Sequence, residues 1–127
     1  MCLILFAWRA HPLHALVVAA NRDEYFERPS RAAAFWDDAP EVLAGRDLTA
    51  QGTWLGVTRA GRFASITNYR NPAERMAMAP SRGRLVTDFL TQGDRPSAYF
   101  AGIAPQAHAY NGFSMLAADR RSLAFFS

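Results

Sequence analysis

The chain has 127 residues, half of them hydrophobic and a fifth charged, which is the size and composition of one small globular domain. The single cysteine, Cys2, excludes a disulfide framework and zinc sites built from several thiolates. No apolar run is long enough to cross a bilayer, and the apolar opening lacks the basic stretch and length of a signal peptide. We therefore expect a cytoplasmic protein with no transmembrane segment.

The net charge of +3 does not by itself indicate a nucleic-acid partner. All fourteen basic residues are arginine, and Arg120-Arg121 is the only adjacent pair. Proteins that bind RNA or DNA gather their basic residues into a patch or stripe. We expect no nucleic acid among the partners.

The first twenty residues predict a β-hairpin. Residues 2–8 and 15–19 are apolar and rich in strand formers, and the segment between them contains a proline. A turn centred near His11 places Cys2 opposite about Ala20 in an antiparallel pair. The polar residues 21–24 then lie beside the beginning of the chain.

A second hairpin is predicted further along. Residues 25–52 read as irregular, apart from a short strand at 41–44. Two strands, 53–59 and 62–68, then flank a tight Ala60-Gly61 turn. Counting outward from this turn pairs Thr53 with Asn68, so Asn68 stands at the open end, where the strand gives way to a loop at 69–72.

Two helices and two more strands complete the prediction. Ser81 is a plausible cap for a helix whose apolar residues recur over 85–90 and which ends at Gly93. Pro96 opens a short second helix that runs to about Gly102. Strands at 110–118 and 122–127 follow, which makes the fold class α+β with antiparallel sheet.

Cys2 is the first candidate for chemistry. Removal of Met1 would give one residue both a thiol and a free α-amine, and an α-amine has an ordinary pKa of about 8. The unprotonated amine can act as general base for its own side chain, as in N-terminal nucleophile hydrolases. The alternative is a buried cysteine without chemistry.

The segment Asn21-Arg22-Asp23-Glu24 is the second candidate. The hairpin brings Asp23 near the amine of Cys2, where its carboxylate would orient the amine while favouring the protonated form. Arg22 can favour a thiolate or bind a substrate carboxylate as a fork, and Asn21 is a further candidate for substrate binding. The alternative is a solvated loop.

Asn68 is the third candidate. A side-chain amide at a strand end can direct its NH2 group at a developing oxyanion. The alternative is that Asn68 and Asn71 only cap a turn before Pro72. The three histidines have no metal-ligand spacing, so we expect no metal and no cofactor.

Several short motifs follow one another along the chain, and they are Met1-Cys2, Ala19-Ala20-Asn21-Arg22-Asp23-Glu24, Arg28-Pro29, Gly52-Thr53-Trp54-Leu55-Gly56, Thr67-Asn68-Tyr69, Arg82-Gly83-Arg84-Leu85-Val86 and Tyr110-Asn111-Gly112-Phe113. Their order resembles that of the NRDE family, to which the eukaryotic transport and Golgi organisation proteins belong. The resemblance implies a place among the N-terminal nucleophile hydrolases, whose fold is a four-layer αββα sandwich with two antiparallel sheets. Family members are considerably longer, and the chain end is apolar, so we expect one domain over 1–127 that is truncated on its C-terminal side.

The cysteine branch of that superfamily, which includes penicillin V acylase and bile-salt hydrolase, implies roles for three residues. Cys2 matches the nucleophile, Asp23 an aspartate that contacts the N-terminal amine, and Asn68 an asparagine of the oxyanion hole. The branch has an arginine three residues before that aspartate, where this chain has Ala20. Arg22 is close by but not equivalent, and a later asparagine and arginine of the branch fall beyond residue 127.

Two functions follow from these readings. The first is a hydrolase in which Cys2 attacks an amide or acyl group of a small molecule. The second is a non-enzymatic carrier or chaperone for a lipid-like or haem ligand, in line with the Golgi, lipid and haem-trafficking roles associated with eukaryotic members. Trp8, Trp36, Trp54 and Phe63 are candidate walls of such a ligand cleft, and the alternative is that they are ordinary core residues. Separately, the apolar chain end suggests a homo-oligomer.

Overall fold

The computed structural model describes residues 2–69 and 76–127, so Met1 and the predicted loop residues 70–72 lie outside the described part. It has an α+β fold with two antiparallel sheets, as predicted. The elements are β1 (Leu3–Trp8), β2 (Leu16–Asn21), β3 (Ser30–Phe35), β4 (Val42–Asp47), β5 (Leu55–Thr58), β6 (Phe63–Asn68), α1 (Gly83–Thr91), α2 (Pro96–Ile103), the 3-10 helix η2 (Ala104–Ala109), β7 (Phe113–Ala118) and β8 (Leu123–Phe126).

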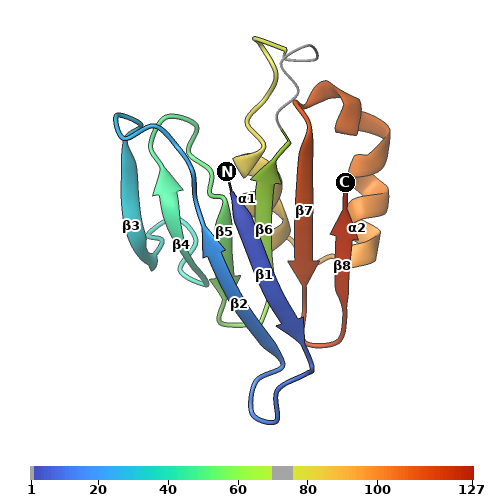
Figure 1. Cartoon of the computed structure of the whole chain (residues 1–127). Coiled ribbons are helices and arrows are strands. Elements are labelled where there is room, and N and C mark those ends of the chain that lie inside the picture. The colour runs from blue at the N-terminus through green and yellow to red at the C-terminus, as the bar shows by residue number, and fades with distance from the viewer. Residues whose placement is uncertain (1, 70–75) are drawn as a thin grey trace.

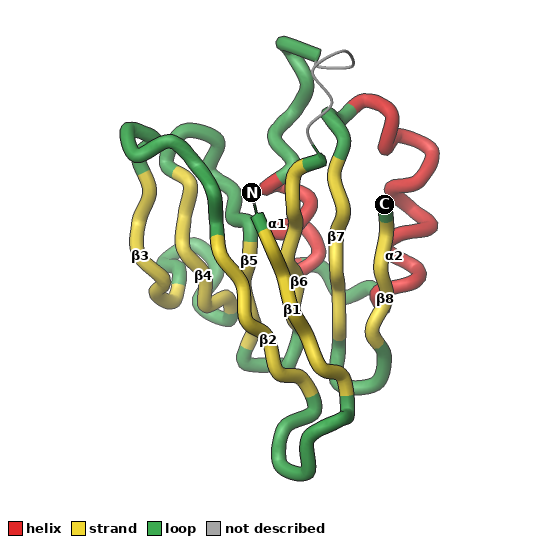
Figure 2. Tube along the Cα trace, in the orientation of Figure 1, coloured by secondary structure: helices red, strands yellow, loops and turns green. Residues whose placement is uncertain are grey.

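Three layers stack on one another (Figures 1 and 2). The middle layer is a six-stranded sheet in which β3 to β8 follow each other in chain order. One face packs on the helices, where Ile66 and Met115 meet Val86 and Phe89 in the core. The other face packs on the β1–β2 hairpin through a smaller cluster around Phe63 and Leu116. This arrangement is consistent with the expected αββα sandwich, and helices lie on one side only over the described residues.

The first hairpin forms as predicted, with a register two residues away from the expected one. Ile4, not Cys2, pairs with Ala20, and Leu3 pairs with Asn21. The difference arises because the loop is centred on Pro12 rather than His11. The new register brings Cys2 level with the polar segment 21–24.

The irregular reading of residues 25–52 was wrong for β3 and missed the second half of β4. β3 and β4 pair along this stretch, with a bulge between Arg31 and Ala34, and the short strand predicted at 41–44 is the beginning of β4. All six residues of β3 are exposed and three are alanine, so the strand has neither the alternation nor the β-formers that reveal a strand in a sequence. Pairing with β4 makes it a strand.

The second hairpin is one residue out of the expected register. Leu55 pairs with Ser65 because the turn holds three residues, 59–61, rather than two. Gly61 has a φ of 80°, in the left-handed region that closes such a turn. Asn68 is the last residue of β6, as predicted.

Both helices lie close to their predicted positions. α1 buries Leu85, Val86, Phe89 and Leu90, but its N-cap is Arg82 rather than Ser81, and no side chain caps it. Pro96 opens α2 as predicted. None of the helices in the described part of the chain is long and apolar enough to cross a membrane.

Candidate active site around Cys2

A cavity of about 360 Å³ opens at the end of the sheets where the hairpin, β4, β6 and the start of α1 meet. Cys2, Arg22, Asp23 and Asn68 all line it, although the sequence singled them out in three separate segments. Asn21 does not line this cavity; its side-chain oxygen accepts a hydrogen bond of 3.1 Å from the backbone N–H of Leu3. The structure therefore gathers four of the five candidate residues.

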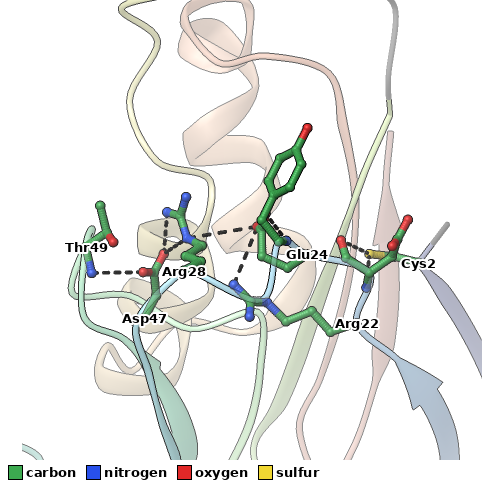
Figure 3. Close-up of polar contacts among 8 residues, drawn as sticks. Cys2, Arg22, Glu24, Arg28, Asp47 and Thr49 are labelled. Atoms are coloured by element: carbon green, nitrogen blue, oxygen red, sulfur yellow. Dashed lines mark hydrogen bonds and ion pairs between the residues drawn. The ribbon is translucent and has the colours of Figure 1, made fainter.

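The thiol of Cys2 is held by the backbone of Asp23 (Figure 3). The N–H of Asp23 donates to the Cys2 Sγ at 3.3 Å, and the Sγ lies 3.8 Å from the carbonyl oxygen of the same residue. Cys2 is half-buried, so one side of the sulfur is fixed while the residue still reaches the cavity.

The carboxylate of Asp23 has a separate expected role. Because Met1 precedes Cys2, the Cys2 nitrogen belongs to a peptide bond in this chain, and it becomes an amine only after Met1 is removed. The contact between this amine and the Asp23 carboxylate stays a prediction. The backbone contact places the two residues side by side, which is what that contact requires.

Charged side chains form a chain of contacts along the cavity wall, which we call the Glu24–Asp47 network (Figure 3). Glu24 Oε2 lies 3.5 Å from Arg22 Nη2 and 3.9 Å from Arg28 Nε. Arg28 donates twice to Asp47 Oδ2, at 2.6 and 3.1 Å. Burial disfavours the charged Asp47 carboxylate, but hydrogen bonds from Arg28 and the N–H of Thr49 keep its pKa below the ordinary value.

Sequence reasoning missed Arg28 and Asp47 as site residues. Glu24 and Arg28 have the i,i+4 spacing of an ion pair, which is the signal that was available. Asp47 lies in a segment that was read as a loop, and nothing in the sequence connects it to Arg28, nineteen residues earlier. Only the pairing of β3 with β4 brings the two together.

Asn68 reaches the cavity, and its role as an oxyanion donor stays a prediction. It ends β6 opposite Phe113 and lines the same cavity as Cys2. Its side-chain amide has no hydrogen-bond partner among residues 2–69 and 76–127. The NH2 group is therefore available to a ligand in the cavity.

Two glycines place the start of α1 at the cavity. A Cβ on Gly52 would lie 2.6 Å from the carbonyl carbon of Gly83, and one on Gly83 would lie 3.0 Å from the carbonyl oxygen of Thr53. The N–H of Thr53 donates to the carbonyl of Gly83 at 3.3 Å. The two glycine-containing motifs at 52–56 and 82–86 thus meet backbone to backbone.

Asn111 fastens the segment that forms another wall of the cavity. Its side chain accepts from the N–H of Met76 at 2.8 Å and donates to the carbonyl of the same residue at 2.9 Å. Arg82 donates to the carbonyl of Gly112 at 2.8 Å. The sequence predicted only a turn at Asn111-Gly112, but this pair also holds the segments around Met76 and Arg82 in place.

The cavity wall is mainly polar. Of the four aromatic residues considered as walls of a ligand cleft, only Trp54 lines it. Trp36 and Phe63 are core residues, and Trp8 packs against the smaller core cluster. In the part of the chain that the structure describes, no three His, Cys, Asp or Glu side chains gather in a way that could hold a metal ion.

Comparison with known proteins identifies the family. The family model of Transport and Golgi organisation 2 matches residues 1–127. The chain is 40% identical to the Transport and Golgi organization 2 homolog of Mus musculus and to the Transport and Golgi organization protein 2 homolog of Homo sapiens, over 94% of this chain and 45% of each relative. It is 34% identical to the Transport and Golgi organization protein 2 of Drosophila melanogaster, over 74% of this chain and 36% of that protein. The chain thus spans less than half the length of these relatives, and it belongs to the Transport and Golgi organisation 2 family.

Proposed function

We propose that this chain carries the nucleophile of an N-terminal-cysteine hydrolase that cleaves an amide bond or transfers an acyl group of a small molecule. The observation that supports this most is that Cys2 and Asn68 line one cavity. A nucleophile and an oxyanion donor are the two groups that acyl transfer needs first. The backbone contact from Asp23 to the sulfur adds the orientation.

The reaction begins once Met1 has been removed and Cys2 has a free amine. The amine takes the thiol proton, and Sγ attacks the substrate carbonyl carbon. The negative charge that develops on the carbonyl oxygen accepts a hydrogen bond from the Asn68 amide. The protonated amine then gives its proton to the leaving nitrogen as the C–N bond breaks, and water hydrolyses the thioester that remains on Cys2. Asp23 would hold the ammonium form between these two proton transfers.

The character of the cavity favours this reading over an apolar-ligand carrier. Sites for drug-sized apolar ligands are lined mainly by hydrophobic and aromatic side chains. Here charged residues make up much of the wall, and Trp54 is the one large aromatic among the described residues that line it. A carrier role for a lipid-like or haem ligand, connected with the transport and Golgi organisation named in the relatives, is the second candidate. A reduced, reactive thiol fits a cytoplasmic location.

The first experiment is the intact mass of the purified chain, which must lack the mass of one methionine for Cys2 to have a free amine. We then expect Cys2, the only cysteine, to react with iodoacetamide faster than an inert buried thiol. Hydrolysis of a panel of N-acyl p-nitroanilides should disappear in Cys2→Ala. A haem titration that gives a Soret band, with no hydrolysis in the panel, would favour the carrier.

The Asn68 amide is tested in the same panel. Asn68→Ala should lower the acylation rate by about 10²- to 10³-fold, the loss that follows removal of one oxyanion donor. The control is Gln106→Ala, which removes an exposed amide away from this cavity. Equal rates in the two variants would exclude the proposed role of Asn68.

A further inference from the structure

The cavity around Cys2 has an excess of arginine. Five arginines and three carboxylates line it. The carboxylates are those of Asp23, Glu24 and Asp47, and the arginines are Arg22, Arg28, Arg31, Arg46 and Arg82. An excess of positive charge in a partly enclosed space attracts anions more strongly than the same charges do on an open surface.

Most of these guanidinium groups already have a partner. Arg28 forms an ion pair with Asp47, and Arg22 forms one with Glu24. Arg46 donates to Asp38, in the connection between β3 and β4, at 2.5 and 2.8 Å, and its guanidinium lies over the Trp36 ring at 4.3 Å. These contacts hold Arg46 in place and use both of its Nη groups, while its buried Nε has no hydrogen-bond partner among the described residues.

Arg31 is different. Its guanidinium has neither an ion pair nor a hydrogen bond with any residue in the ranges that the structure describes. It stands directly opposite Arg46 across β3 and β4, and like charges at directly opposite positions destabilise a strand pair. The five donors of Arg31 are therefore available, and a bound anion would relieve the repulsion.

The start of α1 adds to the positive potential of the same cavity. Ser81, Arg82 and Gly83 line it, and the first turn of α1 has no acidic residue. Helix N-termini carry a partial positive charge that acidic residues usually offset. In this helix nothing on its own first turn offsets it.

We infer, on the basis of the hydrolase proposed above, that the substrate carries a carboxylate or a phosphate, and that Arg31 is the residue that binds it. A guanidinium offers two parallel N–H groups to either kind of oxyanion. Arg28 is less suited because it already donates its Nε and Nη2 groups to Asp47. The anion would hold the substrate at one end of the cavity and leave its carbonyl group to Cys2.

The test uses inorganic pyrophosphate and citrate as the phosphate and carboxylate probes, with binding measured by calorimetry. We expect at least one probe to bind the wild-type chain and its affinity to fall about tenfold or more in Arg31→Gln, the loss of one charged hydrogen-bond pair. Arg95→Gln is the matched control, because it removes the same charge from an exposed position away from the cavity. The affinity of Arg95→Gln for the same probe should stay within twofold of the wild-type affinity. The probe that binds more tightly identifies the anion class.

Two results would overturn the anion site: no binding of either probe to the wild-type chain, or equal losses in Arg31→Gln and Arg95→Gln. Alkylation of Cys2 by iodoacetamide, which is uncharged, is read in the same samples. Anion binding that depends on Arg31 together with an inert Cys2 supports the anion site and rejects the hydrolase. A reactive Cys2 together with an anion affinity that is unchanged in Arg31→Gln rejects the anion site and still supports the hydrolase.

Discussion

Asp23 has two parts that can act on Cys2, the backbone N–H, which contacts the sulfur, and the carboxylate, which is expected to contact the amine. The sulfur is held by the backbone N–H of Asp23, so this contact survives any substitution that keeps the backbone in place. The carboxylate takes no part in this contact, so its expected role at the amine of a processed Cys2 can be removed separately. Backbone and side chain can therefore be tested apart.

Asp23→Asn makes that test. We expect the fold to survive, because the amide has the shape of the carboxylate, and we expect the rate of Cys2 alkylation in the processed chain to change severalfold as the charge beside the amine is lost. Asp37→Asn, an exposed aspartate away from this cavity, is the control. If segment 21–24 were only a solvated loop, Asp23→Asn would leave stability within about 0.5 kcal/mol of wild type and would leave Cys2 unchanged.

Asp47 makes the stability of the chain depend on acid. Its pKa is lower in the folded chain than in the unfolded one, so it stabilises the fold at pH values above its ordinary pKa of about 4. That contribution is lost as the pH falls through the lower, folded value. In Asp47→Asn the free energy of unfolding should therefore depend less steeply on pH below about 4, as measured by urea unfolding at a series of pH values.

The same variant should be less stable than wild type at neutral pH, by about 1 to 2 kcal/mol, because the half-buried Arg28 loses its charged partner. Asp37→Asn is again the control and should keep the wild-type pH dependence. If the free energy of unfolding of Asp47→Asn fell with pH below about 4 as steeply as that of wild type, the Arg28–Asp47 pair would not contribute to stability.

At the scale of elements, the position of α1 depends on two glycines, Gly52 and Gly56, that contact the helix at its start and near its end. Gly52 touches the backbone at the start of α1, and Gly56 touches Leu90 near its end: a Cβ on Gly56 would lie 2.7 Å from Leu90 Cδ1. The helix thus lies unusually close to the sheet at both ends. This spacing sets where Ser81, Arg82 and Gly83 meet the cavity.

Gly52→Ala should destabilise the chain by about 1 to 3 kcal/mol, the usual cost of overpacking, because its Cβ would meet backbone atoms that cannot rotate away. Thermal or urea unfolding measures the change. Gly102→Ala is the control of opposite sign. It lies in α2 with no atom within 4 Å of its added Cβ, so alanine should stabilise the chain by up to about 1 kcal/mol.

The elements also show what a sequence can predict. Both hairpins, α1 and the start of α2 follow from local patterns, because apolar runs, turn residues and helical spacing are local features. β3 could not be predicted, because its alanines become a strand only through β4. Each hairpin register depended on a loop geometry, the centre at Pro12 and the left-handed Gly61, that composition does not specify.

The site follows the same rule. Cys2, Asp23 and Asn68 could be placed together from hairpin counting and from the family resemblance. Arg31 and Asp47 could not, because their place at the cavity depends on the β3–β4 pair.

At the scale of the whole molecule, the β1–β2 hairpin leaves an apolar face uncovered over the described residues. Leu3, Leu5 and Val17 are 52%, 60% and 42% exposed, and they alternate with the residues that pack on the larger sheet. Contiguous apolar surface of this kind marks a site of association. We therefore expect the chain to self-associate through this face.

Leu5→Ser should therefore reduce self-association at high concentration, as measured by light scattering. Leu13→Ser is the control, because Leu13 is 82% exposed but lies in the β1–β2 loop rather than on the strand face. A wild-type chain that stays monomeric at high concentration would contradict this expectation, as would an equal effect of the two substitutions.

The cavity has a consequence for the order of events during synthesis. Its walls are drawn from residue 2 and from residues as late as 111, so it cannot close until residue 111 has left the ribosome. At about 5 to 20 residues per second, this leaves roughly 5 to 20 s after Cys2 is made. An aminopeptidase that removes Met1 from the nascent chain would have this interval before Asn68 and the later walls of the cavity are in place. If Cys2 is the nucleophile proposed above, its processing would then precede closure of the cavity.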